Sequence, residues 1–222
     1  MNASHEDGLD LGHRDNALSI MHVDEHLLVL DKPSGLLSVP AKPPGPSDCL
    51  EARARSAYPD ALLVHRLDRD TSGVMVFARS RLAQRHLNWQ FERRQVRKTY
   101  VARVWKGPKT ASGTIELPLI CDWPNRPLQM VCHERGKPAV TEWRVLERGS
   151  NWTRVELSPM TGRSHQLRVH MRELGCPILG DPFYADGEAL AAADRLQLHA
   201  TRLEFRHPDG GARVAYECAS PF

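Results

Sequence analysis

The chain has 222 residues and a net charge of +3, so it can bury a sizeable core, but its charge alone does not indicate a polyanion partner. The five cysteines are an odd number without a C-x-x-C pair, which argues against a disulfide framework or a zinc ribbon and favours free thiols. No apolar run approaches the roughly 18 residues of a membrane helix and the N-terminus is no signal peptide, so a cytoplasmic protein is expected.

Residues 1–17 are predicted to be a disordered tail, and residues 18–222 a single domain, because no break in composition marks a boundary. Leu27–Leu30 is a predicted buried strand followed by a turn at Lys32–Gly35. Asp48 with Glu51 resembles a capping box for a helix that runs toward Tyr58.

Leu82–Arg94 is a predicted helix with apolar residues at every fourth position on the face that packs against a core: Ala83, Leu87 and Phe91. The opposite face carries Trp89 among three arginines, Arg81, Arg85 and Arg93. A basic face with an aromatic residue is compatible with RNA contact, but an ordinary solvated face explains the same pattern. Arginine supplies 24 of the 30 basic residues, and its planar guanidinium suits phosphates and base edges.

A second predicted helix, Arg163–Leu174, places Leu167, Met171 and Leu174 on one face and ends at Gly175. Pro208–Gly211 is predicted to close a hairpin between 203–206 and 213–217. Further strands are predicted at Tyr100–Trp105, Val140–Leu146, Thr153–Leu157, Leu196–His199 and Leu203–Phe205. Strands outnumber helices, so the expected class is α+β with a mixed, mostly antiparallel sheet.

The most informative segment is His65–Gly73, which reads H-R-L-D-R-D-T-S-G between two apolar runs. It places the carboxylate of Asp68 between Arg66 and Arg69, where nearby positive charge favours the ionised form. Such a group suits nucleophilic or base chemistry. The alternative is that Asp68 and Arg66 form a structural ion pair in a loop.

Three other segments accompany this motif: Lys32–Pro40, the K-x-Y-x-A run at Lys98–Ala102, and the G-R-x-H-Q-L-R run at Gly162–Arg168. Together, in this order, they resemble the RluA-type pseudouridine synthases from about Ile20 to the C-terminus. Residues 117–127 and Ile178–Asp181 resemble a short member of this family that acts on both ribosomal and transfer RNA. Many members carry an N-terminal RNA-binding module of the S4 type, whereas only about 20 residues precede the first predicted strand here.

The resemblance implies the pseudouridine synthase fold, with flanking helices and loops around an RNA-binding cleft. Asp68 matches the family's catalytic aspartate, Tyr100 the tyrosine that stacks on the flipped base and can help to remove the C5 proton, and Arg168 the arginine that pairs with the aspartate. Arg66 matches the arginine that enters the RNA stack. Further candidate RNA contacts are His65, Arg69, Arg163, His165, Trp123, Arg126, Arg81, Arg85 and Arg93. The implied substrates are loop uridines in 23S ribosomal RNA and the first loop position of the tRNA anticodon stem-loop, and a monomer is expected.

The chemistry is consistent with these residue types. Isomerising uridine breaks a glycosidic bond and forms a C–C bond without oxidation or addition, so no cofactor is expected, and no dinucleotide or P-loop motif is present. His133, His165 and His170 lack the spacing of a zinc helix, so no metal site is expected. The base must be extruded from its stack, which is cheaper in a loop.

Two alternatives remain open. An RNA-binding or RNA-chaperone relative without activity would keep the basic face but tolerate the loss of Asp68. A nucleoside-cleaving glycosidase would normally pair Asp68 with a second carboxylate, and Asp70 is the nearest in sequence.

Overall fold

The computed structural model describes residues 18–43 and 45–222, and the predicted tail at 1–17 lies outside the described residues. A ten-stranded sheet has the order β1-β2-β4-β11-β5-β10-β9-β6, with β12 paired to β11 and β3 paired to β4. Its strands are β1 (Ser19–Val23), β2 (Leu27–Lys32), β3 (Leu62–Leu63), β4 (Ser72–Ala78), β5 (Arg97–Trp105), β6 (Ser112–Glu116), β9 (Val140–Arg148), β10 (Trp152–Pro159), β11 (Leu198–Arg206) and β12 (Arg213–Glu217).

A separate two-stranded sheet and four helices complete the described part of the chain. The small sheet pairs β7 (Leu119–Cys121) with β8 (Gln129–Val131). The helices are α1 (Leu50–Ala57), α2 (Arg81–Glu92), α3 (Gln166–Glu173) and α4 (Gly187–Ala191). The predicted α+β class is therefore confirmed.

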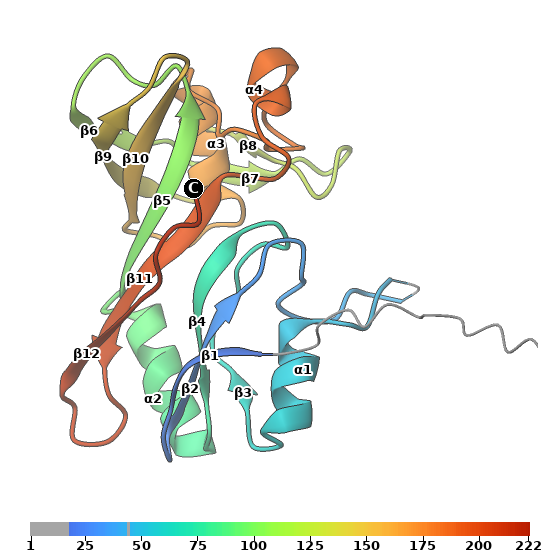
Figure 1. The fold of residues 1–222 in the computed structure, drawn as a ribbon, viewed down its shortest axis with the longest axis vertical. Coiled ribbons are helices and arrows are strands. Elements are labelled where there is room, and N and C mark those ends of the chain that lie inside the picture. The colour runs from blue at the N-terminus through green and yellow to red at the C-terminus, as the bar shows by residue number, and fades with distance from the viewer. Residues whose placement is uncertain (1–17, 44) are drawn as a thin grey trace, which may run out of the picture.

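The long strands β5 and β11 cross the middle of the molecule and join its two halves (Figure 1). One half contains β1 to β4 with α1 and α2, and the other contains β6, β9 and β10 with α3. Of the pairings in the large sheet, β11 with β4 is the parallel one, with His199 opposite Ser72 and Ala200 opposite Gly73. The sheet is mixed and mostly antiparallel, as predicted.

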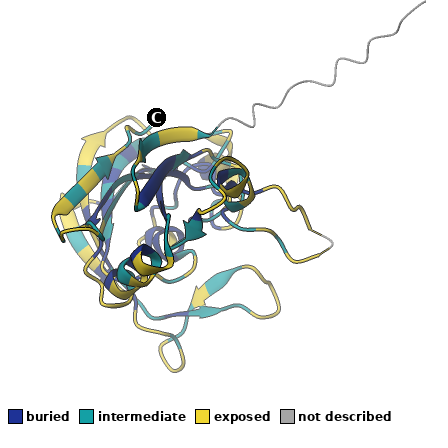
Figure 2. Ribbon diagram, turned by 90° about the horizontal axis from the view of Figure 1, so that it is seen from below, coloured by how far each residue is buried: buried dark blue, intermediate teal, exposed yellow. Residues whose placement is uncertain are grey.

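β2 shows how this sheet is buried on both faces. Its residues Leu27–Leu30 are fully buried, because successive side chains point to opposite faces and each face is covered. Leu27 and Val29 pack in the cluster that includes α2, whereas Leu28 and Leu30 pack in the cluster that includes α1. Figure 2 shows this buried centre surrounded by exposed loops and helix faces. Each buried leucine contributes about 1.5 to 3 kcal/mol relative to an exposed one.

The start of α1 differs from the predicted capping box. Cys49 is the N-cap, and its Sγ accepts a hydrogen bond from the Ala52 N–H at 3.3 Å. Asp48 instead forms an ion pair with Arg53 at 2.7 Å. The thiol therefore takes the place that the sequence pattern assigned to Asp48 and Glu51.

Two predicted strands, Leu196–His199 and Leu203–Phe205, are one strand, β11. The register of β11 against β5 shifts between Ala200 and Arg202, so a bulge interrupts the apolar pattern without ending the strand.

The second predicted helix also differs in detail. α3 begins at Gln166 rather than Arg163, because His165 has a φ of +53° and cannot continue the helix. Every residue of 166–171 is buried, so α3 is a core helix and not one with a single apolar face.

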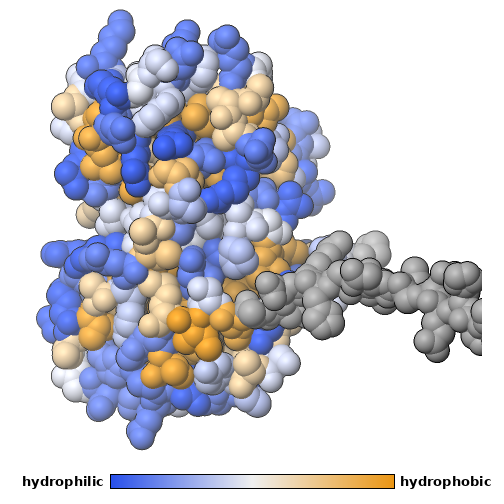
Figure 3. All heavy atoms as spheres, viewed as in Figure 1, coloured by the Kyte–Doolittle hydropathy of each residue, from blue (hydrophilic) through white to orange (hydrophobic). Residues whose placement is uncertain are grey.

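In the described ranges, no helix is long and apolar enough to cross a membrane. On the face of Figure 1, hydrophilic residues cover most of both ends, and apolar residues gather in the lower half near β1 (Figure 3). Ile20 and Val23 of β1 are among the exposed large hydrophobic residues.

Gly73 brings β4 into close contact with β11. Its φ is +114°, and a Cβ on this residue would lie 2.3 Å from the carbonyl oxygen of Ala200. We expect Gly73→Ala to lower the free energy of unfolding by about 2 to 5 kcal/mol, because it adds backbone strain and a clash. Gly35→Ala is the matched control: its φ is +83° with open space around it, so only strain of about 1 kcal/mol is expected. If urea denaturation gave equal losses in the free energy of unfolding for the two variants, the close contact between Gly73 and Ala200 would not be the reason that glycine is needed here.

Candidate active site

The loop that carries Asp68 links β3 to β4 and is held in place by residues 32–38. Lys32 is fully buried, and its Nζ donates to three carbonyl oxygens at 2.6 to 2.9 Å, those of Pro33, Leu36 and Arg69. Burial lowers the pKa of Lys32 to about 8, although nearby aspartates oppose the shift. On the other side of Asp68, the Ser38 hydroxyl donates to the carbonyl oxygen of Leu67 at 2.7 Å. The backbone on both sides of Asp68 is therefore fixed.

Arg168 on α3 joins Asp68 to a second carboxylate. Its Nε and Nη2 donate to the two carboxylate oxygens of Asp181 at 2.8 and 2.6 Å. The third contact is weaker, since Nη1 lies 3.5 Å from Oδ2 of Asp68. The side chains of Arg168 and Asp181 are 2% and 0% exposed, and that of Asp68 is 32% exposed. Burial opposes the charged form of Arg168, but Asp181 outweighs it and the pKa of Arg168 is raised.

His165 is the second group beside the Asp68 carboxylate. Its Nε2 lies 3.9 Å from Oδ2 of Asp68, and its Nδ1 lies 2.7 Å from the hydroxyl of Tyr184. The Tyr184 hydroxyl accepts a hydrogen bond from the Gln129 N–H at 2.8 Å, so its own proton can be donated to Nδ1. Burial lowers the pKa of His165, so the ring is neutral at pH 7. When Tyr184 donates to Nδ1, the neutral ring carries its proton on Nε2, which faces Asp68.

Tyr100 and Asp68 line the same cleft, which has a volume of about 310 Å³. Tyr100 lies on β5, between Ala200 of β11 and Leu157 of β10. Burial, followed by the charge of Asp68, raises the pKa of Tyr100, so its side chain is a neutral phenol. The structure therefore brings together the three predicted catalytic residues, Asp68, Tyr100 and Arg168.

Three cationic side chains line the same cleft as the Asp68 carboxylate. Arg66 and Arg163 line the cleft, and Lys98 lines it from β5, two residues before Tyr100 and on the same face of the strand. The Lys98 Nζ donates to the carbonyl oxygen of Thr161 at 3.3 Å. Burial, together with Arg94, lowers the pKa of Lys98 to about 8. The cleft thus carries positive charge where a phosphate backbone could lie.

The other predicted RNA contacts differ in their surroundings. The His65 ring lines the cleft, accepts a hydrogen bond from the Val76 N–H at 3.1 Å and stacks on Phe91. Burial lowers the pKa of His65 to about 3, so it is an uncharged wall of the cleft. Arg69 is exposed and pairs with Asp70 at 3.0 Å.

Six of the predicted contacts lie outside the cleft lining, and Arg69 is one of them. Trp123 and Arg126 lie in the loop between β7 and β8, where the guanidinium sits 4.6 Å from the Trp123 ring. The remaining three are exposed: Arg81 and Arg85 on α2, and Arg93 at its C-cap.

The alternative of an Asp68–Arg66 ion pair is wrong. In the described part of the chain, the ion-pair partner of Asp68 is Arg168, and the neutral His165 ring lies 3.9 Å from its Oδ2. Asp70, the second acid that a glycosidase would need, pairs with Arg69 and does not line the cleft. Among the described residues that line the cleft, Asp68 is the single carboxylate.

A model of the RNA pseudouridylate synthase family matches residues 26–173, a range that includes Asp68, Tyr100 and Arg168. The chain belongs to this family. It is an RNA pseudouridine synthase, an isomerase that converts uridine in RNA to pseudouridine, as its sequence motifs predicted.

Known relatives support this assignment over almost the whole chain. The synthase is 54% identical over 206 residues to the dual-specificity RNA pseudouridine synthase RluA of Salmonella typhi, covering 92% of this chain and 94% of that protein. The RluA of Escherichia coli K12 is 53% identical with the same coverage. The solved structure of human RNA pseudouridylate synthase domain containing 1 superposes with a TM-score of 0.80 at 28% identity, covering 93% of this chain and 85% of that one.

Asp181 and Tyr184 were not predicted as site residues of the synthase. Ile178–Asp181 contributed to the resemblance, but the sequence does not show that its carboxylate binds Arg168. Lys98 was also not singled out, although the alternation of side chains along a strand places it beside Tyr100.

Asp181→Asn should destabilise the synthase strongly, because it leaves the buried charge of Arg168 with only the distant carboxylate of Asp68. We expect a loss of about 3 to 5 kcal/mol in the free energy of unfolding, measured by urea denaturation. Asp70→Asn is the control, since it removes a partly exposed ion pair worth less than about 1 kcal/mol. Similar losses in the free energy of unfolding of both variants would show that Asp181 is not the main counter-charge of Arg168.

Proposed function

We propose that the synthase acts on a loop uridine in large-subunit ribosomal RNA and on the first uridine of the anticodon loop in certain tRNAs. The support is identity of 52 to 54% to enzymes whose names state dual specificity. A uridine in a hairpin loop costs less to extrude than a paired one, which favours such substrates. We also propose that residues 18–222 act as one catalytic domain, as a monomer in the cytoplasm.

The reaction centre in this proposal is the Asp68 carboxylate. Arg168 and His165 both approach its Oδ2, and the described residues form no hydrogen bond to Oδ1, so Oδ1 is the oxygen that reacts in this proposal. Oδ1 can attack C1′ of the sugar, attack C6 of the base or take the C2′ proton. In each route the N1–C1′ bond breaks, a C1′–C5 bond forms, C5 loses its proton and N1 gains one. The single carboxylate in the cleft is the observation that carries this assignment.

Tyr100 supplies the surface on which the extruded base stacks. Because its pKa is raised, Tyr100 is not a phenolate in the resting enzyme and does not serve as a standing base for the C5 proton. A neutral aromatic ring stacks on any base and tolerates rotation of the base in its plane. Tyr100 therefore holds the base while its attachment changes from N1 to C5.

Arg66 helps to open the RNA. It is exposed at the cleft, two residues before Asp68, and has no ion-pair partner among the described residues. Extruding a base costs a few kcal/mol, and a planar guanidinium that fills the gap offsets part of this cost. Arg163 and Lys98 then bind the backbone near the flipped nucleotide.

Asp68→Asn should slow tritium release from RNA that contains 5-tritiated uridine by a factor of about 10⁴ or more, because the reacting carboxylate oxygen is lost. Asp70→Asn is the matched control and should stay within a few-fold of wild type. Ribosomal RNA fragments and tRNA are assayed separately, so release from only one of them limits the proposed specificity. Release by Asp68→Asn at the wild-type rate would remove Asp68 from the mechanism, and free uracil among the products would indicate a glycosidase.

Arg66→Ala should slow single-turnover conversion of a structured hairpin by about tenfold, since roughly 1.4 kcal/mol of stack filling is lost. A short unpaired oligonucleotide, in which no stack must be opened, should be converted at nearly the wild-type rate. An equal loss on both substrates would indicate that Arg66 binds RNA without filling the stack.

A further inference from the structure

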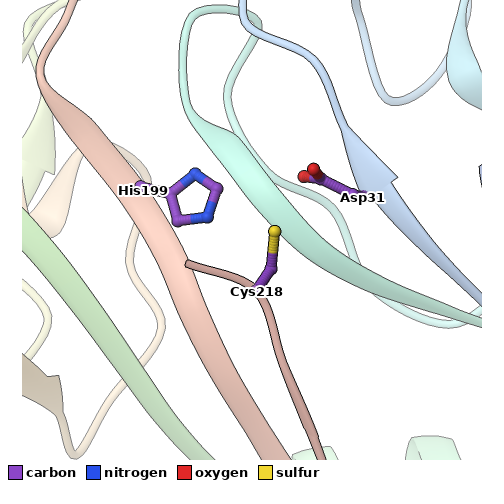
Figure 4. Close-up of side chains that lie close together, drawn as sticks. All are labelled: Asp31, His199 and Cys218. Atoms are coloured by element: carbon purple, nitrogen blue, oxygen red, sulfur yellow. The ribbon is translucent and has the colours of Figure 1, made fainter. Parts of the chain in front are cut away.

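On the sheet face opposite the cleft, three side chains from separate elements converge (Figure 4). They are Asp31 of β2, His199 of β11 and Cys218, which follows β12. One donor atom of each lies within 4.8 Å of the others. Leu198 lines the cleft, so its neighbour on the strand, His199, points to the other face. The cluster is therefore separate from the site around Asp68.

His199 contains a buried nitrogen without a partner. The residue is 2% exposed, and its Nδ1 lies 2.9 Å from the hydroxyl of Ser72. Within the described ranges, its Nε2 is buried and has no hydrogen-bond partner. In Figure 4 one ring nitrogen faces the sulfur of Cys218, with the carboxylate of Asp31 beyond it. Leaving a buried polar atom unpaired costs about 1 to 3 kcal/mol, so the arrangement calls for a ligand at this position.

We propose that Asp31, His199 and Cys218 bind a zinc ion. Thiolate, imidazole and carboxylate are the donors that zinc takes in proteins, and three protein ligands with one water give its usual four-coordinate geometry. The Ser72 hydroxyl lies 2.9 Å from Nδ1 of His199 and can accept the Nδ1–H that remains when Nε2 binds a metal. On binding, the Cys218 thiol gives its proton to solvent.

Zinc binding would require only a small movement of the three side chains. Donor atoms 2.0 to 2.3 Å from a tetrahedral zinc lie about 3.5 Å apart, so side chains now within 4.8 Å must move by about 1 Å. Cys218 is already anchored, because its N–H donates to the carbonyl oxygen of Thr201 at 2.8 Å. A metal-free cluster, in which the Cys218 thiol donates to Asp31, is the competing arrangement. It leaves Nε2 of His199 unpaired, and zinc does not.

The site has a structural consequence. It joins β2, β11 and the segment after β12, and Ser72 connects it to the start of β4, four residues after Asp68. The metal would therefore fasten the C-terminal segment to the sheet behind the catalytic loop and take no part in the chemistry. Histidine spacing alone predicted no metal site, because these ligands come from positions far apart in the sequence.

Cobalt provides a direct test on the full chain. After treatment with a chelator, the wild type should bind one Co²⁺ with the visible bands of a tetrahedral site and a thiolate-to-cobalt charge-transfer band, and Zn²⁺ should displace it. Cys218→Ser should lose the charge-transfer band and at least tenfold in affinity, and His199→Gln should lose at least tenfold in affinity. Cys132→Ser, outside the cluster, is the matched control and should behave as wild type.

A second measurement does not depend on spectra. Zinc at about 100 times the wild-type Kd should raise the Tm of the wild type by about 5 °C or more, and should raise that of Cys218→Ser by at most about half as much. The proposal is overturned if the wild type shows no thiolate-to-cobalt band, if Cys218→Ser keeps it, or if zinc stabilises both proteins equally. None of these readouts depends on the substrate or on Asp68.

Discussion

The buried guanidinium of Arg168 is the interaction on which the site depends. A charge that is 2% exposed is costly unless its donors are paired, and Asp181 pairs two of them in one plane. The remaining nitrogen, Nη1, then lies 3.5 Å from Oδ2 of Asp68 and makes only a weak contact with it. This is consistent with the burial of residues 166–171 of α3: the helix holds a charged side chain in the core, and the core must supply the counter-charge. Arg168 therefore links the packing of the core to the position of Asp68.

Burial also sets the charge of the other groups in the cleft. His65, His165 and Tyr100 are all kept neutral, so Asp68 is the anion facing a solvent-accessible space that is lined by cations. Both fixed donors approach the same oxygen of Asp68. Neutral rings beside a single carboxylate favour a reaction in which the base is held by stacking while one oxygen changes its bonding. A second acid would be needed to protonate a leaving base for hydrolysis, and the described cleft provides none.

The sequence predicts local features of this fold well and long-range ones poorly. The strands around Asp68, the helix at α2 and the hairpin at β11 and β12 follow from periodicity and turn residues. The partner of Arg168 does not, because Asp181 is separated from it by a helix end and a loop. The Cys49 cap and the bulge of β11 were missed for similar reasons: both depend on atoms that the sequence pattern does not bring together. Motif resemblance predicted roles for Asp68, Tyr100 and Arg168, but it could not show that Arg168 and His165 approach the same oxygen of Asp68.

The contact between β4 and β11 is more important for the position of the Asp68 loop than its length suggests. Only two residue pairs form this parallel pairing, yet it places the end of the Asp68 loop against the strand that crosses the molecule. A close backbone contact and a side-chain hydrogen bond both support this pairing. Gly73 allows the close approach to Ala200, and Ser72 bonds to His199 on the face away from the cleft. A short pairing needs such support because each ladder hydrogen bond contributes only about 1 kcal/mol. A metal bound to His199 would act at this junction, which is why a site remote from the chemistry can still stabilise the loop that performs it.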